Sequence, residues 1–527
     1  MRVLYNARIH TLDETHPTAT AIVIDRGRIL ALGGDDLRLA FARGTQPQDL
    51  GGRTVIPGLV DAHIHLQHYA LALQKVDCEV ATREECLDRI SERAAQTPPG
   101  IWILGHGWNQ NNWLEGYGSA ADLDIVAPHN PVYLTAKSLH AGWANSEALR
   151  IARIDLNTPN PSDGKIQRDE HGNPTGILFE GAMRLMSETI PEPSATELAS
   201  LLEKAQTNLQ TLGITGVHDF DRQVCFAALQ ILHAEENLKI RVVKSIPVDA
   251  LPHAVKLGLR SGFGDDWLRI GGVKAFMDGA LGPHTAAMLE PYEDDPVNRG
   301  MLLIDAEELF EYGQSAAANG LPMAVHAIGD RANHEVLNAF EQLRKFESNN
   351  GIRGLRHRIE HVQILHPQDQ HRLAELGIIA SMQPIHATSD MLMADAYWGQ
   401  RAAHSYAWRT QLEQGAILAF GSDAPVESPN PFWGLHAAVT RRRADGTPGP
   451  AGWYPEQRLN ILEALRGFTA GPAYTAGMEN RLGKLTPDYL ADLLVLDVNP
   501  FTCEPDTLKE IQPVATMVGG EWMVSNL

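Results

Sequence analysis

The sequence has few features of a membrane-spanning, secreted or disulfide-stabilised protein. No stretch approaches the ~18 uninterrupted apolar residues of a membrane-spanning helix. The first residues, MRVLYNARIHTLD, do not contain the apolar core of a signal peptide. The chain has only four cysteines, and none of them stands in a Cys-x-x-Cys pair. We therefore expect free thiols and a cytoplasmic location.

Positive charge is also scarce. The chain has 44 Lys and Arg residues against 65 Asp and Glu residues, so its formal net charge is -21 at pH 7. A negative field of this kind repels phosphate groups, so neither nucleic acid nor an anionic membrane is an expected partner. With 527 residues, of which 44% are hydrophobic, the chain is long enough for two globular domains. Its 22 histidines are a high number, so their positions relative to the predicted strands are informative.

The middle of the chain alternates short apolar segments with helical ones, such as ELASLLEKAQTNLQTLG. This alternation is typical of βα units around a parallel sheet. The predicted strands span residues 54–62, 214–219, 240–246, 268–275, 321–326, 356–361, 377–382 and 416–421. Their number is what a closed barrel requires, so we expect an α/β fold, a (β/α)8 TIM barrel.

Both ends of the chain have the pattern of short β-strands, for example AIVIDRGRILALG and ADLLVLDV. We expect residues 1–55 and 475–527 to form one small β-sandwich domain, and residues 56–474 to form the barrel. About 150 residues separate the first two predicted strands, far more than one helix needs. An inserted subdomain is therefore expected after the first barrel strand, at about residues 71–193. Such an insertion follows the carboxyl end of a strand and is a candidate lid.

His63 and His65 form the strongest local signal for a site. They follow PGLVDA at the end of the first predicted strand. Residues i and i+2 of a strand point to the same side, so both imidazoles could reach one metal ion. The alternative is a pair of surface histidines beyond the end of the strand.

Four further polar residues stand at the carboxyl ends of later predicted strands. They are Lys274 in GGVKAFMDG, His326 in MAVHAIGD, His361 in RIEH and Asp423 in FGSDAP. Each has an ordinary explanation when taken alone, such as a solvated lysine or an aspartate that caps a turn. A barrel, however, brings all carboxyl ends of its strands to one mouth. Their joint occurrence indicates one metal site more than a series of coincidences.

The residue types are consistent with metal binding. Four imidazoles and one carboxylate suit zinc, and they could also bind iron, manganese or nickel. Lys274 needs an explanation, because a cation repels an ammonium group. A neutral lysine amine can add carbon dioxide and become a carbamate, an anionic oxygen ligand that can bridge two metal ions. A carboxylated Lys274 could therefore bridge two divalent ions, with zinc as the first choice.

The motifs PGLVDAHIH, GGVKAFMDGALG, VHAIGD, RIEH, SMQP, GSDAP and LADLLVLD occur in this order along the chain. Together they resemble the amidohydrolase superfamily, and in particular its amidohydrolase-3 branch, which includes the YtcJ-like proteins and the N-substituted formamide deformylases. The resemblance covers nearly the whole chain and includes the β-sandwich and the insertion. One departure is Asp488, where the family more often has glycine, in a turn of the sandwich.

The resemblance also implies a role for each residue of the site. His63, His65 and Asp423 are expected to hold the more buried metal ion, and His326 and His361 the second. A carboxylated Lys274 and a hydroxide are expected to bridge the two ions. Asp423 is further expected to be the catalytic proton shuttle.

Some residues are weaker candidates. Trp108, Asn109 and Trp113 in GHGWNQNNW of the insertion could stack on and orient a substrate, or the two tryptophans could be core residues of the inserted subdomain. His218 and His284 are better explained as structural histidines.

Polar residues just beyond two later strands could also take part. Gln383 and His386 in MQPIH are candidate substrate-binding residues. Asp330 and Arg331 in HAIGDRAN, together with Gln383, could orient metal ligands through hydrogen bonds.

The expected reaction is hydrolysis of a non-peptide carbon–nitrogen bond by attack of a metal-bound hydroxide. The substrate would be a small amide, an N-formyl or N-acyl amine, or a cyclic amide, and Asp423 would pass a proton to the leaving amine. A small-molecule substrate is thus the expected partner, and a homodimer is the common default assembly.

Three alternatives remain open. A deaminase usually has one metal ion and no carbamate, so Lys274 argues against it. An esterase, lactonase or carbamate hydrolase would use the same nucleophile. An inactive metal-binding regulatory protein belongs to another class, and the complete ligand set argues against it.

Overall fold

The computed structural model describes residues 1–41, 45, 47–138 and 140–527. These residues form two compact units. The first combines Met1–Tyr69 with Ala195–Leu527, and the second is the contiguous stretch Ala70–Ser194.

The larger unit contains a barrel of eight parallel strands, in the order β21-β20-β19-β18-β17-β16-β15-β8. In chain order the strands are β8 (Leu59–Ile64), β15 (Ile214–Asp219), β16 (Arg241–Pro247), β17 (Leu268–Phe276), β18 (Met323–Ala327), β19 (Arg358–His361), β20 (Ile379–Met382) and β21 (Leu418–Phe420). A parallel bridge between Ile64 and Ala424 closes the sheet between β8 and the segment after β21. The backbone N–H of Asp423 donates to the carbonyl of His63 at the same place, at 2.7 Å. The expected TIM barrel is confirmed.

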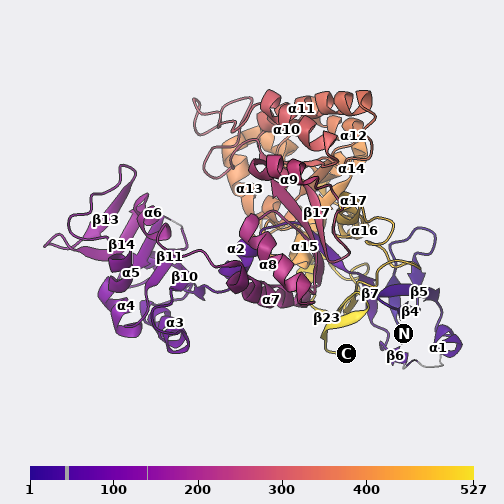
Figure 1. Cartoon of the computed structure of the whole chain (residues 1–527), viewed down its shortest axis with the longest axis horizontal. Helices are drawn as coiled ribbons and strands as arrows, with labels where there is room; N and C mark the ends of the chain where they lie inside the picture. Colours follow the sequence, from indigo (N-terminus) through magenta and orange to yellow (C-terminus); the bar gives the residue numbers. More distant parts are fainter. Residues whose placement is uncertain (42–44, 46, 139) are drawn as a thin grey trace. The chain divides into compact units, whose positions relative to one another are not determined.

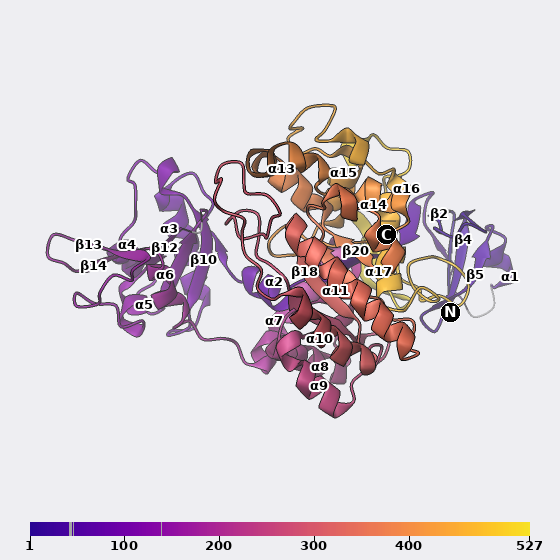
Figure 2. The ribbon, with the colours of Figure 1, turned by 90° about the horizontal axis from the view of Figure 1, so that it is seen from above.

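Amphipathic helices cover the outside of the barrel. They include α7 (Ala195–Thr211), α8 (Gln223–Ala234), α9 (Leu251–Leu257), α10 (Ala306–Ala318), α11 (Asp330–Asn349), α12 (Arg372–Leu376) and α14 (Trp408–Gln414). In α11, Val336, Phe340 and Leu343 recur at helical spacing and are buried. Figure 2 shows α10 beside α11, and a Cβ at Gly313 of α10 would lie only 2.9 Å from the side chain of Leu343. A glycine therefore lets the two helices approach closely.

The prediction of one strand over residues 54–62 is wrong. The structure has two strands there, β7 (Thr54–Pro57) and β8, separated by Gly58. Strand β7 pairs with the sandwich strand β22 (Leu493–Leu496), whereas β8 pairs with β15 of the barrel. A Cβ at Gly58 would lie 2.4 Å from Oγ1 of Thr215, so only glycine fits where the chain passes from one domain to the other. The other barrel strands begin and end within two residues of the predicted ranges.

Both ends of the chain build the β-sandwich, as expected. One sheet has the order β5-β4-β1-β6 and the other β24-β23-β22-β7-β2-β3. Their strands are β1 (Arg2–Tyr5), β2 (Arg8–His10), β3 (Thr18–Ala19), β4 (Ala21–Asp25), β5 (Arg28–Gly33), β6 (Pro47–Asp49), β23 (Pro513–Val518) and β24 (Glu521–Ser525), with β7 and β22. Ile9, Val55, Leu493 and Met517 pack in one core cluster, and Figure 1 marks both chain ends at this domain.

The smaller unit has its own mixed sheet, in the order β13-β14-β12-β11-β10-β9. Its strands are β9 (Val76–Asp77), β10 (Ile103–Trp108), β11 (Val132–Ala136), β12 (Ala141–Ala144), β13 (Gly164–Arg168) and β14 (Pro174–Glu180), and its helices are α3 (Arg83–Gln96), α4 (Ala120–Val126), α5 (Ser146–Ile151) and α6 (Ala182–Ser187). Trp108, Trp113 and Trp143 belong to its hydrophobic core. In neither unit is any helix of the described residues both long and apolar enough to cross a membrane.

Candidate metal centre

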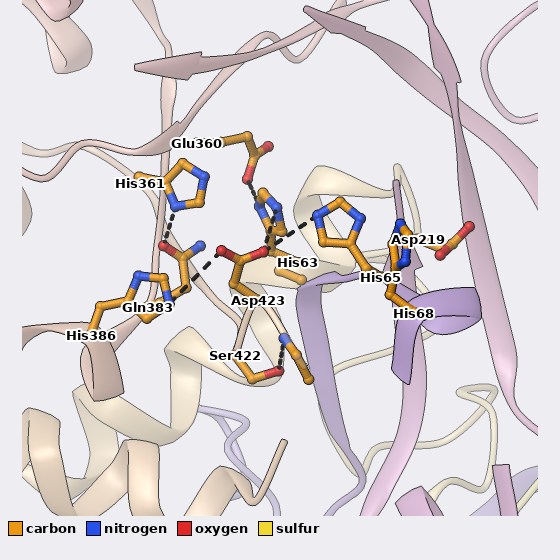
Figure 3. Close-up of polar contacts among 12 residues, drawn as sticks. His63, His65, His68, Asp219, Glu360, His361, Gln383, His386, Ser422 and Asp423 are labelled. Atoms are coloured by element: carbon orange, nitrogen blue, oxygen red, sulfur yellow. Dashed lines mark hydrogen bonds and ion pairs between the residues drawn. The ribbon is translucent and has the colours of Figure 1, made fainter. Parts of the chain in front are cut away.

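The carboxyl ends of the barrel strands bring predicted ligands together, and Figure 3 shows His63, His65, His361 and Asp423 among them. Nε2 of His63 and Nε2 of His65 each lie 3.4 Å from Oδ1 of Asp423. The ring of His361 has its centroid 4.9 Å from that of His63 and 4.6 Å from that of His326. Residues on β8, β18, β19 and the segment after β21 therefore meet at one mouth, although they are far apart in sequence.

Two of these residues have a backbone conformation that L-residues rarely adopt. His361 has φ 77° and Asp423 has φ 60°. In a regular strand, consecutive residues point to opposite faces. On β19, however, both Glu360 and His361 approach His63. The positive φ of His361 turns its side chain away from the opposite face, where a regular strand would place it, toward the face of Glu360. Such conformations cost free energy and concentrate at functional sites.

Hydrogen bonds at the outer nitrogens hold three of the imidazoles. Nδ1 of His63 lies 2.6 Å from Glu360, Nδ1 of His65 lies 3.0 Å from Asp221, and Nδ1 of His361 lies 2.8 Å from Gln383. Each partner atom is an acceptor, so Nδ1 carries the proton and Nε2 keeps a free lone pair.

His326 is held through its other ring nitrogen. Its Nε2 lies 2.9 Å from the carbonyl oxygen of Gly279, so Nε2 carries the proton and Nδ1 has the lone pair that can bind a metal ion. Burial lowers the pKa of His326 to about 3, with the charge of Lys274 adding to the effect. Burial also lowers the pKa of His63 and that of His361 well below the ordinary value. These imidazoles are therefore neutral at pH 7, as metal ligation requires.

Lys274 has a buried and unpartnered amine. Its Nζ has no hydrogen bond within the described part of the chain, and the residue is 3% exposed. The rings of Phe220 and Phe276 lie 4.6 and 4.8 Å from it. Burial lowers the pKa of Lys274 to about 8, although the charges of Glu360 and Asp423 oppose the shift. A neutral amine is thus accessible near neutral pH, and a carbamate with metal partners would satisfy the orphaned group.

Asp423 is suited to exchange a proton. Burial raises its pKa to about 6, although the charges of His65 and Lys274 oppose the shift. Oxygen and nitrogen atoms of His63, His65 and Asp423 all lie within 4.8 Å of one another, so the residues fit one cation. The donor set of imidazole and carboxylate is one that divalent transition metals prefer.

A family model described as the amidohydrolase family matches residues 46–524. The chain belongs to the amidohydrolase family. Protein LONG AFTER FAR-RED 3 of Arabidopsis thaliana is 35% identical to it, over 98% of this chain and 90% of the relative. The N-substituted formamide deformylase of Arthrobacter pascens is 29% identical, over 98% of this chain and 97% of the relative. The resemblance seen in the motifs is thereby confirmed.

A solved structure agrees with this family membership. An uncharacterized metal-dependent hydrolase from Pyrococcus furiosus superposes with a TM-score of 0.80 at 30% identity, over 95% of this chain and 100% of that chain. Together with the assembled donors, these findings make this amidohydrolase a metal-dependent hydrolase.

The weaker candidate residues of this amidohydrolase differ in the contacts that they make. His386 is buried with its Nε2 3.9 Å from Oδ2 of Asp423, and that nitrogen has no hydrogen bond in the described structure. Gln383 uses its oxygen for His361, while its amide nitrogen has no partner among the described residues. Asp330 accepts a hydrogen bond from the backbone N–H of Leu289, and its role in orienting a ligand stays a prediction.

The structure also shows the contacts of Arg331, Trp108 and Trp113. Arg331 donates its backbone N–H to the carbonyl of Ala287, and its proposed role in orienting a ligand stays a prediction. The indole of Trp108 is fully buried and donates to the carbonyl of Leu134, and that of Trp113 donates to the carbonyl of Val80. These contacts favour the interpretation of the two tryptophans as core residues.

Asn109 caps a short 3-10 helix of the smaller unit, where its side chain accepts a hydrogen bond from the N–H of Asn111. His218 is buried beside Arg358, and the ring of His284 binds the carboxylate of Asp294, which makes both histidines structural as expected.

Three buried carboxylates of the site escaped the sequence analysis. Glu360 and Asp221 hold His63 and His65, and Asp61 accepts the backbone N–H of His63 at 3.0 Å. One signal was present for Glu360: in RIEH it stands two residues after a basic residue, Arg358, within a predicted barrel strand. Opposite charges at i and i+2 share one face, which is difficult to explain in a barrel interior unless they pair.

Proposed function

We propose that this amidohydrolase cleaves a non-peptide carbon–nitrogen bond in a small amide, an N-formyl or N-acyl amine, or a cyclic amide. The observation that carries the proposal is the position of Asp423, whose carboxylate lies 3.4 Å from Nε2 of both His63 and His65. A carboxylate so placed can both bind a cation and exchange a proton. One relative, which aligns with nearly the whole chain, is named N-substituted formamide deformylase, and this supports N-formyl amines as the first substrates to test.

The residues that would hold two divalent ions are assigned from their donor atoms. His63, His65 and Asp423 would hold one ion, and His326 and His361 the other, with zinc as the first choice and iron, manganese or nickel as alternatives. Bound there, the metal would polarise the scissile carbonyl and lower the pKa of water, so that water attacks at neutral pH.

Lys274 would join the two groups of ligands after a covalent change. Its neutral amine adds to the carbon of carbon dioxide, an N–C bond forms, one C=O π bond becomes an oxyanion, and a proton leaves the nitrogen. The product is a carbamate with two oxygens. Its position between the aromatic rings of Phe220 and Phe276 excludes water from the nitrogen.

Side chains at the mouth of the barrel would transfer the protons and bind the substrate. Asp423 takes a proton from the attacking water and then gives it to the nitrogen of the leaving amine, which departs poorly until it is protonated. The unpartnered nitrogens of Gln383 and His386 would donate hydrogen bonds to the substrate. Burial lowers the pKa of His386 to about 4, so its ring is neutral at pH 7 and acts as a donor without charge.

The first test is the metal content per chain by plasma emission, on protein purified with bicarbonate present, followed by assays on N-formyl amines, N-acyl amines, cyclic amides and esters. About two zinc-like ions per chain with amide turnover would support the proposal. One ion, with turnover of amino-substituted heterocycles instead, would favour a deaminase. Turnover of esters or lactones alone would favour an esterase. Metal without any hydrolysis would favour a regulatory protein, and no metal after reconstitution would overturn the proposal.

A further inference from the structure

A continuous row of buried polar groups lies behind His63. Oε2 of Glu360 lies 2.6 Å from Nδ1 of His63, and Oε1 of Glu360 lies 2.8 Å from Nε of Arg358. Glu360 is 0% exposed and Arg358 is 4% exposed. The guanidinium of Arg358 also donates to the carbonyl of Ala62 and lies 4.9 Å above the ring of Phe220. An imidazole, a carboxylate and a cation thus follow one another inside the barrel.

A similar row lies behind His65. Oδ1 of Asp221 lies 3.0 Å from Nδ1 of His65, and its other oxygen accepts the backbone N–H of Gln67. The ammonium of Lys244 lies 2.7 Å from Asp219 and also donates to the carbonyl of Asp221. All three charged residues are buried. Each histidine of the His-x-His pair is therefore held by a buried carboxylate, but the cations differ: Arg358 pairs with the carboxylate of Glu360, whereas Lys244 holds Asp221 through its backbone carbonyl.

Stability alone does not explain these rows. A buried ion pair rarely stabilises a fold more than well-packed apolar side chains of the same volume, because both charges lose their hydration. The arrangement does, however, determine which ring nitrogen carries the proton. A carboxylate that accepts from Nδ1 leaves Nε2 bare, and Nε2 is the atom of His63 and His65 that faces Asp423.

We propose that Glu360 with Arg358, and Asp221 with Lys244, are positioning residues that hold the two imidazoles ready for a metal ion before it arrives. Each carboxylate sets the tautomer and orientation of its histidine; Arg358 holds Glu360 by pairing with its carboxylate, and Lys244 holds Asp221 by donating to its backbone carbonyl while it pairs with Asp219. The inference rests on the proposed metal site. Its consequence is a higher affinity for metal, since partners of this kind are worth about 10- to 100-fold in metal affinity.

The chain contains a matched arrangement away from the mouth. Nε2 of His357 lies 2.6 Å from Glu347, which in turn lies 2.7 Å from Arg344. Here, Nδ1 of His357 already accepts the backbone N–H of Met323, so neither ring nitrogen is free for a metal ion. In this second His–Glu–Arg row His357 and Glu347 are buried and Arg344 is partly exposed, and the row offers a control with the same residue types and no role in metal binding.

The experiment compares Glu360→Gln with Glu347→Gln in the full-length protein stripped of metal. The zinc dissociation constant is measured by competition with a chromogenic chelator, and the unfolding temperature of the apo protein is measured in parallel. We expect Glu360→Gln to weaken zinc binding about 10- to 100-fold and Glu347→Gln to leave it within about twofold, while both lower the unfolding temperature.

A double variant separates the two roles of Glu360. In Arg358→Met/Glu360→Gln the buried cation is removed with its partner, so the apo protein is expected to regain stability relative to Glu360→Gln, whereas its zinc affinity stays low. If Glu360→Gln does not fold, Asp221→Asn provides the same comparison at His65.

Two results would overturn the proposal in different ways. Unchanged zinc affinity in Glu360→Gln and Asp221→Asn, with normal binding in the wild type, would reduce both rows to packing and leave the proposed function intact. A wild-type protein that binds no zinc would overturn the metal site itself and the proposed function with it.

Discussion

Ser422 donates both its backbone N–H and its hydroxyl to the carboxylate of Asp61, across the seam where the segment after β21 meets β8. The same carboxylate accepts the N–H of His63, and the hydroxyl oxygen of Ser422 accepts the N–H of Ala424. The turn that carries Asp423 is therefore attached to the strand that carries His63. The distance between the proposed shuttle and its neighbouring imidazoles depends on this seam.

Ser422→Ala should impair both turnover and stability. The variant loses one donor to Asp61 and one acceptor for Ala424, which should cost about 1–3 kcal/mol in the free energy of unfolding. Because Asp423 then moves more freely, kcat should fall about tenfold or more. Ser405→Ala is the control, since its buried hydroxyl donates only to the carbonyl of Ala402. Urea unfolding and steady-state kinetics of both variants test this; equal kcat values in the two would contradict it.

Asp423→Asn should abolish most hydrolysis on any substrate that the wild type turns over. The amide cannot accept and return a proton, so kcat should fall about 10²- to 10⁴-fold. Asp445→Asn, an exposed change in a surface turn, serves as the control. Full turnover by Asp423→Asn would show that the shuttle is another group.

Stability should depend on pH through Asp390. Burial raises its pKa from 3.8 to about 6, although the hydroxyl of Tyr406 donates to it. The folded state then binds this proton more tightly than the unfolded state does. The contribution to stability is complete below the unfolded pKa of 3.8 and is lost as the pH rises through about 6.

Asp390→Asn removes that dependence, because an amide still accepts from Tyr406 and does not titrate. Between pH ~4 and pH ~7 the stability of the wild type should fall relative to the variant by about 2–3 kcal/mol. Urea unfolding of both proteins across this range measures the difference. Parallel profiles would show that Asp390 has the same pKa in both states.

Trp108→Ala should destabilise the smaller unit and spare the metal site. The ring of Trp108 packs 6.1 Å from that of Trp113 and 6.3 Å from that of Trp143, measured between centroids. Removal of a buried tryptophan should cost about 3–5 kcal/mol of unfolding free energy, with unchanged metal content. Tryptophan fluorescence during urea unfolding follows this unit. A raised KM with unchanged stability would instead support the substrate-binding interpretation.

Residues 70–194 are expected to fold without the rest of the chain. Both of their hydrophobic clusters are built only from residues between 76 and 190. Expressed alone, this segment should show a cooperative urea transition by circular dichroism. A fragment without cooperative unfolding would contradict the independence of the unit.

The sequence predicted the barrel and the donor residues because both leave a local pattern. His326 and His361 stand at the carboxyl ends of predicted barrel strands, and a barrel fold alone is enough to bring such residues to one mouth. The motifs of a known family strengthened the same conclusion, and the position of Asp423 next to His63 and His65 agrees with it.

The supporting carboxylates could not be assigned in this way. Glu360 and Asp61 are polar residues inside buried strands, and their partners Arg358 and Ser422 are identified only once the register of the barrel is known. The boundary at Gly58 was missed for a related reason. The apolar run continues through it, and only the contact with Thr215 shows why the strand must break there.

The pairing of β7 with β22 has a consequence for biosynthesis. Val55 and Ile56 of β7 leave the ribosome long before their partners Val495 and Leu494 are translated. Until β22 is made, the growing chain therefore displays an apolar strand edge that its partner does not yet cover, a state that favours aggregation. The sheet cannot be completed before β22 emerges, so demand for chaperones should rise with the time taken to translate the barrel, and a ribosome that stalls before β22 should release an insoluble product.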